Sequence, residues 1–171
     1  NAGVALEPDA RVFADEIWPG QITQGGLLAE GFRRARGWLR PVSDPRASQH
    51  TKFRALAAAA QALEAEPIAP PVVVNFEETV NAAGIAQPAC TRCGDCCGGC
   101  NPGAKNTVAL TYLPDAVRHG AHLFTEAMVS SLAREPNGDW QVRVKRLDQG
   151  NGGVEVTMTA EMVILAAGTL G

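Results

Sequence analysis

The stretch that decides the fold class lies near the end of the chain and reads Met162-Val163-Ile164-Leu165-Ala166-Ala167-Gly168. A continuous apolar run that ends at a glycine is typical of a strand covered on both faces in a parallel sheet. In such sheets a helix follows each buried strand. We therefore expect residues 162 to 168 to form a buried strand of an α/β or mixed α+β fold. Because the chain starts at Asn1 and stops soon after this run, we also expect it to be an internal fragment with an incomplete core.

Three further strands are predicted before this run. Residues 122 to 132, 140 to 146 and 154 to 158 are β-like segments. Turn sequences separate them, at Asn137-Gly138-Asp139 and at Gly150-Asn151-Gly152-Gly153. Such turns between successive strands indicate an antiparallel meander.

The earlier part of the chain predicts helices and one extended segment. Apolar residues recur at helical spacing in residues 8 to 18, where Asp9 can cap the helix and Pro19-Gly20 ends it. The same reasoning predicts helices at 27 to 39, at 52 to 65 and from Thr111, as the cap, to Gly120, with an extended, proline-bounded segment at 67 to 77.

Composition and charge exclude two classes of partner. The 171 residues are 46% hydrophobic, which is typical of a globular domain, and the net charge is -3. Lys and Arg are dispersed, and Arg33, Arg34 and Arg36 lie mostly on the solvated face of a predicted helix, so we expect no nucleic-acid partner and give these arginines no ligand role. No apolar stretch approaches the roughly 20 residues of a membrane-spanning helix. We therefore expect no membrane span.

A glycine-rich dinucleotide loop is absent from the sequence. Such loops carry the pattern G-x-G-x-x-G between a strand and a helix. The nearest imitation is Gly150-Asn151-Gly152-Gly153, which has Glu155 in place of the third glycine and lies in a predicted hairpin. We interpret it as a turn.

All five cysteines fall within eleven residues, from Cys90 to Cys100. The spacing of Cys90, Cys93, Cys96 and Cys100 matches the ligand run of bacterial ferredoxins, so these four residues are candidate ligands for an iron-sulfur cluster. In two-cluster ferredoxins the fourth cysteine of that run serves the other cluster, and the sequence has no remote cysteine to replace it. Zinc, a local disulfide and reduced thiols remain open. We favour a structural disulfide or reduced thiols over a metal.

Three blocks of sequence resemble the glucose-methanol-choline (GMC) superfamily of FAD-dependent oxidoreductases, in its bacterial cholesterol-oxidase-like branch. The first is the cysteine-rich loop, which runs into Gly103-Ala104-Lys105-Asn106-Thr107 and then Thr111-Tyr112-Leu113-Pro114-Asp115-Ala116. The opening Asn1-Ala2-Gly3-Val4-Ala5-Leu6-Glu7-Pro8 resembles the piece after the second flavin loop of that family. The closing Ala166-Ala167-Gly168-Thr169-Leu170-Gly171 resembles its flavin turn. These blocks occur in the family's order.

The resemblance implies FAD as the cofactor and places several residues beside it. Asn1, Ala2, Gly3 and Val4 would pass along the flavin ring. Val129 would pair its backbone with the adenine edge, and the small residues Ala167 and Gly168 would let the main chain approach the ribose and pyrophosphate.

The resemblance also implies a domain division and a reaction. Residues 1–8 and 105–171 would belong to a Rossmann-like FAD domain, and residues 9–104 would form the substrate pocket and its lid. The reaction would be hydride transfer from the CH–OH group of a small-molecule alcohol or sterol to the flavin. The catalytic histidine of the family lies outside this fragment, so no catalytic residue is expected in it and we expect the fragment alone to be inactive.

Two alternatives from other classes remain. One is an iron-sulfur or zinc-binding electron-transfer module, and the other is a structural domain without a cofactor. His50, His119 and His122 match no catalytic motif and are interpreted as surface or packing residues. A cytoplasmic location is favoured, because no leader sequence is visible.

Overall fold

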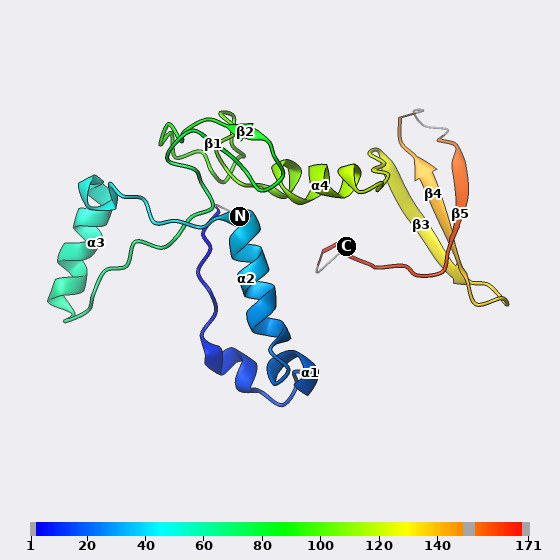
Figure 1. Cartoon of the computed structure of the whole chain (residues 1–171), viewed down its shortest axis with the longest axis horizontal. Coiled ribbons are helices and arrows are strands. Elements are labelled where there is room, and N and C mark those ends of the chain that lie inside the picture. Colours follow the sequence, from blue (N-terminus) through cyan, green and yellow to red (C-terminus); the bar gives the residue numbers. More distant parts are fainter. Residues whose placement is uncertain (1–2, 149–152, 169–171) are drawn as a thin grey trace. The chain divides into compact units, whose positions relative to one another are not determined.

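The computed structural model describes residues 3–148 and 153–168 of the chain (Figure 1). These residues form two compact units, Asn1–Ala121 and His122–Gly171. The first unit contains the helices and a small two-stranded sheet, and the second contains a three-stranded sheet. The mixture of helices and antiparallel strands agrees with the expected mixed α+β class.

Two helices of the first unit lie where the sequence predicted them. The helix predicted at 27 to 39 is α2, and the helix predicted at 52 to 65 is α3, which ends three residues earlier. The helices of this unit are η1 (Ala10–Ala14), α1 (Gly20–Thr23), α2 (Leu27–Leu39), η2 (Ala47–Gln49), α3 (Thr51–Ala62), η3 (Val108–Leu110) and α4 (Tyr112–Arg118).

The helix predicted over residues 8 to 18 is wrong beyond its first turn. Asp9 caps η1 as expected, because its carboxylate accepts a hydrogen bond from Arg11 N at 2.9 Å. Asp15, however, has extended backbone angles, and its side chain accepts from Ile17 N at 3.0 Å. A carboxylate that bonds to the backbone two residues on competes with helix formation. Gly20 then begins α1 instead of ending a helix.

The segment predicted to be extended, residues 67 to 77, forms β-bridges to three other parts of the first unit. Val72 bridges both Val4 and Val42, and Val74 bridges Lys105. The strands β1 (Thr79–Val80) and β2 (Ala86–Gln87) pair in an antiparallel hairpin next to this segment in sequence.

Helix α4 lies where the sequence predicted a helix, but Thr111 does not cap it with its side chain. The hydroxyl of this fully buried residue donates to the carbonyl oxygen of Thr107 at 2.8 Å. Gly120 has φ +91 directly after the helix, which is the backbone conformation that favours glycine at a helix exit.

The antiparallel meander is confirmed in the second unit (Figure 1). Its register shifts between Val129 and Ser131, where β3 carries a bulge. The predicted turn at residues 150 to 153 lies outside the described residues except for Gly153. The strands are β3 (Ala127–Arg134), β4 (Trp140–Arg146) and β5 (Glu155–Ala160), in that order across the sheet.

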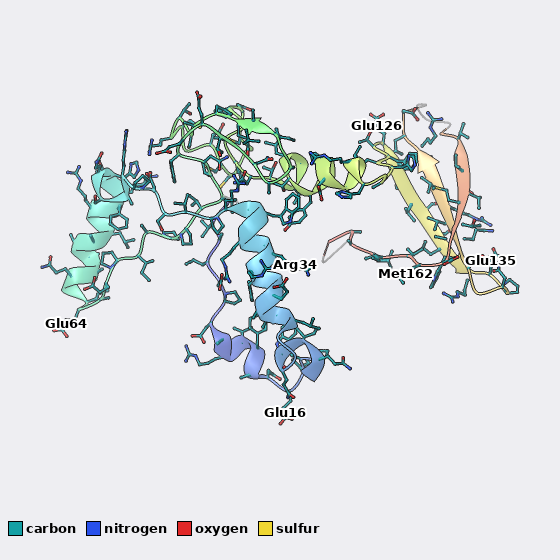
Figure 2. All side chains as sticks on the ribbon, in the orientation of Figure 1. Glu16, Arg34, Glu64, Glu126, Glu135 and Met162 are labelled. Carbon is teal, nitrogen blue, oxygen red and sulfur yellow. The ribbon has the colours of Figure 1, made fainter. Side chains whose placement is uncertain are left out.

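The buried strand predicted at residues 162 to 168 is not formed. This segment, on which Figure 2 labels Met162, is irregular, and the side chains of Ile164 and Leu165 are 82% and 75% exposed. A strand of this kind needs neighbouring strands and helices on both faces. Among the described residues, no parallel strand pairs with it.

Candidate functional site

The interior of the first unit is unusually polar. Asn75, Gln87 and Asn106 are each at most 8% exposed, and their side chains bond to one another. Asn75 Nδ2 donates to Gln87 Oε1 at 3.1 Å, and Gln87 Nε2 donates to the carbonyl oxygen of Gly103 at 2.8 Å. Asn106 Nδ2 donates to the carbonyl oxygen of Leu39 at 2.9 Å, which satisfies a carbonyl at the end of α2. This cluster fixes the segments on both sides of the cysteine loop.

Asn81 fixes the β1–β2 hairpin in the same interior. Its side-chain oxygen accepts from Ala83 N at 2.9 Å and from Ile85 N at 3.0 Å. Its amide nitrogen donates to the carbonyl oxygen of Leu110 at 2.7 Å. Asn81 therefore ties the hairpin turn to η3, which precedes α4.

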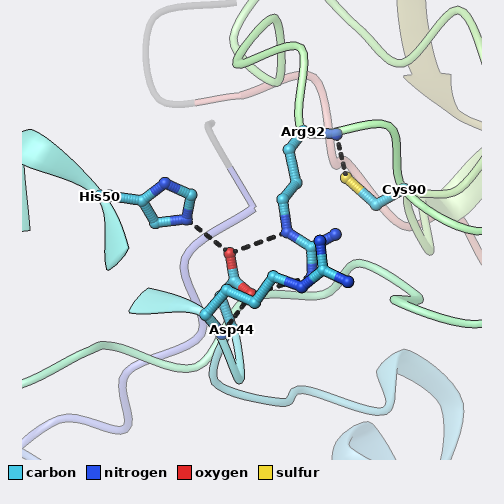
Figure 3. A network of polar contacts seen from close by, with 5 residues as sticks. Asp44, His50, Cys90 and Arg92 are labelled. Atoms are coloured by element: carbon cyan, nitrogen blue, oxygen red, sulfur yellow. Dashed lines mark hydrogen bonds and ion pairs between the residues drawn. The ribbon is translucent and has the colours of Figure 1, made fainter. Parts of the chain in front are cut away.

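A second polar network joins the cysteine loop to the segment before α3 (Figure 3). Arg92 donates two hydrogen bonds to the carboxylate of Asp44, at 3.1 and 3.3 Å, and its guanidinium lies 4.9 Å from the ring centre of Phe76. His50 Nε2 lies 2.8 Å from Asp44 Oδ2, the carboxylate oxygen that also accepts from Arg92 Nε. The backbone of Arg92 has φ +58, a conformation uncommon for a residue with a side chain. Its side-chain contacts hold this conformation in place.

The network changes the acidity of Asp44. Burial alone raises the pKa of this carboxyl, but hydrogen bonds from Arg92, His50 and the backbone of Arg46 together hold the pKa well below its ordinary value. Asp44 is therefore a carboxylate over the whole physiological range, and the Arg92 guanidinium has its countercharge in place.

The cysteine loop forms one wall of a pocket of about 460 Å³ in the first unit. The four cysteines at ferredoxin spacing line the pocket, and Cys97 does not. Asp44, His50 and Arg92 also line it, and Val72, Val74 and Phe76 give it apolar surface. The polar network and the cysteines thus face a common cavity.

All five cysteines are free thiols in the structure. Within residues 3–148 and 153–168, no group of three or more His, Cys, Asp or Glu side chains is placed to hold a metal ion. The candidate ligands Cys90, Cys93, Cys96 and Cys100 share a pocket wall without forming such a group, so the structure gives no support to the iron-sulfur alternative.

Two of the predicted flavin-ring residues are described, Gly3 and Val4, while Asn1 and Ala2 lie outside the described residues. Gly3 is buried, with φ +86, and a Cβ at this position would stand 3.0 Å from Lys105 Cε and 3.3 Å from Val73 Cγ2. A side chain at this position would therefore meet both a strained backbone and tight contacts within the chain itself. Val4 is 46% exposed beside Val72.

The predicted adenine contact, Val129, lies on an open apolar groove of the second unit. The groove has a volume of about 680 Å³, and valines of all three strands line it, including Val144 and Val156. Val129 itself is 52% exposed, and it pairs with Val144 across the sheet. Among the residues that the structure describes, β3 is an edge strand, so half of its backbone groups point away from β4.

The predicted pyrophosphate contacts, Ala167 and Gly168, lie on the exposed segment after β5. Gly168 has φ +93, and no atom of the described chain lies within 4 Å of the place where a Cβ would stand. Residues 169–171, which complete the resembling block, lie outside the described residues. Gly3 and Val4 belong to the first unit, and Val129, Ala167 and Gly168 to the second.

The histidines agree with their interpretation as surface or packing residues. His50 contacts Asp44, and His119 Nδ1 lies 2.9 Å from the carbonyl oxygen of Asp115, within α4 and its cap. Sequence reasoning missed the Asp44–Arg92 pair, which joins positions 48 residues apart. The only signal in the sequence was an arginine placed between two cysteines.

Comparison with known proteins places the chain in a family. A sequence profile described as GMC oxidoreductase matches residues 46–171, which is most of the chain. The chain belongs to the GMC oxidoreductase family, as its sequence blocks suggested.

Two characterised relatives are similar over nearly the whole chain. They are the cholesterol oxidases of two Mycobacterium tuberculosis strains, CDC 1551 and H37Rv, each 29% identical over 183 aligned residues. The alignment covers 99% of this chain and 32% of each relative, so the chain spans about a third of their length. In the described part of the chain, no helix is both long and apolar enough to cross a membrane.

Proposed function

We propose that the chain is part of an FAD-dependent enzyme that oxidises a CH–OH group, with a sterol or another bulky apolar alcohol as the substrate. The observation that carries the proposal is the family match over residues 46–171, which include both the cysteine-lined pocket and the apolar groove. The relatives named cholesterol oxidase favour a sterol hydroxyl as the substrate class. When bound, FAD would supply the acceptor for the hydride that leaves the carbinol carbon.

The described residues of the second unit are compatible with a bound FAD. The groove beside Val129 has an apolar surface of the kind that an adenine ring requires, and the free edge of β3 offers backbone donors and acceptors. At Gly168 the side of the backbone where a Cβ would stand is open, which allows a phosphate or ribose to approach the main chain. These features support a Rossmann-like FAD domain that includes residues 105–171.

The first unit would supply the region around the flavin ring and the substrate. Residues 1–4 would pass along the ring, where backbone N–H groups stabilise negative charge. Val73 N donates to the carbonyl oxygen of Gly3 at 2.8 Å, so this segment is anchored to the buried part of the first unit. Residues 9–104 would form the base and lid of the substrate pocket. The role of these residues is to position the substrate and exclude water.

Anaerobic mixing of the intact protein with cholesterol tests the proposal. We expect the flavin absorption near 450 nm, an approximate value for the bound cofactor, to bleach in one turnover. Deuterium on the carbinol carbon should slow the bleaching several-fold, because this C–H bond breaks in the step. Cholesteryl methyl ether, which has no free hydroxyl, is the matched control and should leave the flavin oxidised. Bleaching of equal rate with the ether would contradict the proposal.

A further inference from the structure

No thiol of the cysteine loop gains or loses a bond in the proposed hydride transfer, yet four of these thiols line one cavity. Cys90, Cys93, Cys96 and Cys100 line the pocket of the first unit, and all are free. A hydride that moves from a carbinol to a flavin needs no thiol. The proposed hydride transfer therefore does not explain why four thiols line this pocket.

Cys90 and Cys96 each make a backbone hydrogen bond to a buried polar residue of the first unit. Cys90 N donates to the carbonyl oxygen of Asn75 at 2.8 Å. The carbonyl oxygen of Cys96 accepts from Lys105 Nζ at 3.0 Å. Both cysteines are half-buried, as Cys100 is, whereas Cys93 and Cys97 are exposed. The chain thus holds these two residues at the pocket wall from two sides of the loop.

The two thiols differ in their environments. The sulfur of Cys90 accepts a hydrogen bond from Arg92 N at 3.3 Å. At Cys96, burial raises the pKa of the thiol, and the charge of Cys90 raises it further. The Arg92 backbone therefore contacts the sulfur of Cys90 directly, at the pocket wall that Cys90 shares with Cys96.

We propose that Cys90 and Cys96 form a dithiol–disulfide site that hydroperoxides oxidise. The Cys90 thiolate attacks one oxygen of hydrogen peroxide, so that an S–O bond forms, the O–O bond breaks, and the leaving hydroxide takes up a proton as water. Cys96 then loses its proton and attacks the sulfur of the Cys90 sulfenic acid, so that the S–S bond forms and a second water leaves. Two thiols thereby give two electrons to one peroxide, and a small dithiol reverses the oxidation.

The pocket suits a small, neutral oxidant. Its volume of about 460 Å³ accommodates hydrogen peroxide easily, and Val72, Val74 and Phe76 form an apolar surface opposite the loop. The Arg92–Asp44 pair is already neutralised, so it does not select for an anion. The proposal does not depend on the identity of the alcohol substrate.

Peptide mapping of the intact protein tests the pairing. The protein is treated with a few equivalents of hydrogen peroxide, its free thiols are alkylated, and it is cut with trypsin. Because no Lys or Arg lies between Arg54 and Arg92, or between Arg92 and Lys105, cleavage after Arg92 separates Cys90 from the other four cysteines. We expect peptides 55–92 and 93–105 to become linked in most of the protein. Fragmentation should locate the link at Cys96, with Cys93, Cys97 and Cys100 alkylated.

Variants and a reductant complete the test. Cys97→Ser, which changes an exposed thiol outside the pocket, should leave the linked peptide at its wild-type level, whereas Cys90→Ser and Cys96→Ser should abolish it. Dithiothreitol should return both peptides to the unlinked form. Links spread equally over all partners of Cys90, or no link after peroxide, would overturn the proposal. Stoichiometric zinc or iron in the anaerobically purified protein, lost on Cys96→Ser, would overturn it too. The peptide map of the wild-type protein tests the proposal even where a variant fails to fold.

Discussion

At the scale of single residues, the Asp44 side chain connects its own loop to the start of α3 and to the cysteine loop. Its carboxylate accepts from the Arg92 side chain, from His50 and from the backbone of Arg46. Arg92 brings the cysteine loop to this carboxylate in a backbone conformation that few arginines adopt. The pair is mostly shielded from water, with side-chain exposures of 24% for Arg92 and 18% for Asp44. Loss of one partner leaves a desolvated charge behind, which is costly.

The first prediction concerns Asp44→Asn and its dependence on pH. Because the folded protein holds the pKa of Asp44 below its ordinary value, the carboxylate contributes stability that is present above the unfolded-state pKa, about 3.9. This contribution is lost as the pH falls through the folded-state pKa. We expect the variant to lose roughly 1–3 kcal/mol of unfolding free energy at pH 7. The deficit should be the same at pH 5 and shrink below about pH 4, as urea unfolding would measure.

Asp9→Asn is the matched control for this prediction. Arg11 also lowers the pKa of Asp9 through hydrogen bonds, but that pair is exposed on η1 and screened by solvent. The control should therefore unfold almost as the wild type does at every pH. A deficit for Asp44→Asn that grew as the pH fell would contradict the assigned direction of the pKa.

The second prediction concerns Gly3→Ala, where two costs add. The first is the backbone conformation at φ +86, and the second is the approach of the new Cβ to Lys105 Cε and Val73 Cγ2. Gly26→Ala has the first cost alone, because Gly26 has φ +74 and no neighbour within 4 Å of a new Cβ. We expect Gly26→Ala to cost about 1 kcal/mol and Gly3→Ala about 1–2 kcal/mol more. Equal thermal midpoints for the two variants would show that the Lys105 side chain moves away from the new Cβ without a cost in stability.

At the scale of elements, the three-stranded sheet has one apolar and one polar face. Val142 and Val144 alternate with Arg143 and Lys145 along β4, and side chains that alternate along a strand point to opposite faces. The valines line the groove that also contains Val129. An antiparallel sheet with this pattern packs one face against another layer and leaves the other to water.

The third prediction compares the same substitution on the two faces. In the intact protein, Val144→Asn should lower the free energy of unfolding by roughly 1–3 kcal/mol, because it places an amide on the covered face. Thr157→Asn, on the neighbouring strand and the opposite face, should change it by less than about 0.5 kcal/mol. Denaturant unfolding of the two variants measures the difference. Equal effects would mean that the apolar face stays exposed in the intact protein.

Some elements were predictable from sequence because their causes are local. α2 and α3 follow from helical periodicity and alanine content, and the β3–β4–β5 meander follows from strand-like segments and a turn at Asn137-Gly138-Asp139. The segment 162 to 168 was not predictable, because its conformation depends on layers that the described residues do not supply. The hydrogen bond from Asn106 to Leu39 was hidden for a related reason, since it joins positions 67 residues apart. Within the candidate site, the sequence indicated the cysteines but not the residues that hold them.

At the scale of the whole molecule, both units expose large apolar side chains. Ile17, Leu63 and Ile164 are 82%, 79% and 82% exposed. Apolar surface on this scale usually marks contacts with another part of a protein or with a ligand. In the function that we propose, a bound flavin would cover part of this surface.

Flavin content measured on the intact protein tests the central claim most directly. The protein is purified anaerobically, denatured, and analysed by chromatography for released flavin and by chemical assay for iron and acid-labile sulfide. The account predicts about one FAD per chain, without iron or sulfide in stoichiometric amounts. A protein without FAD, with about four iron and four sulfide per chain, would contradict it and make the cysteine loop a ligand run for a cluster.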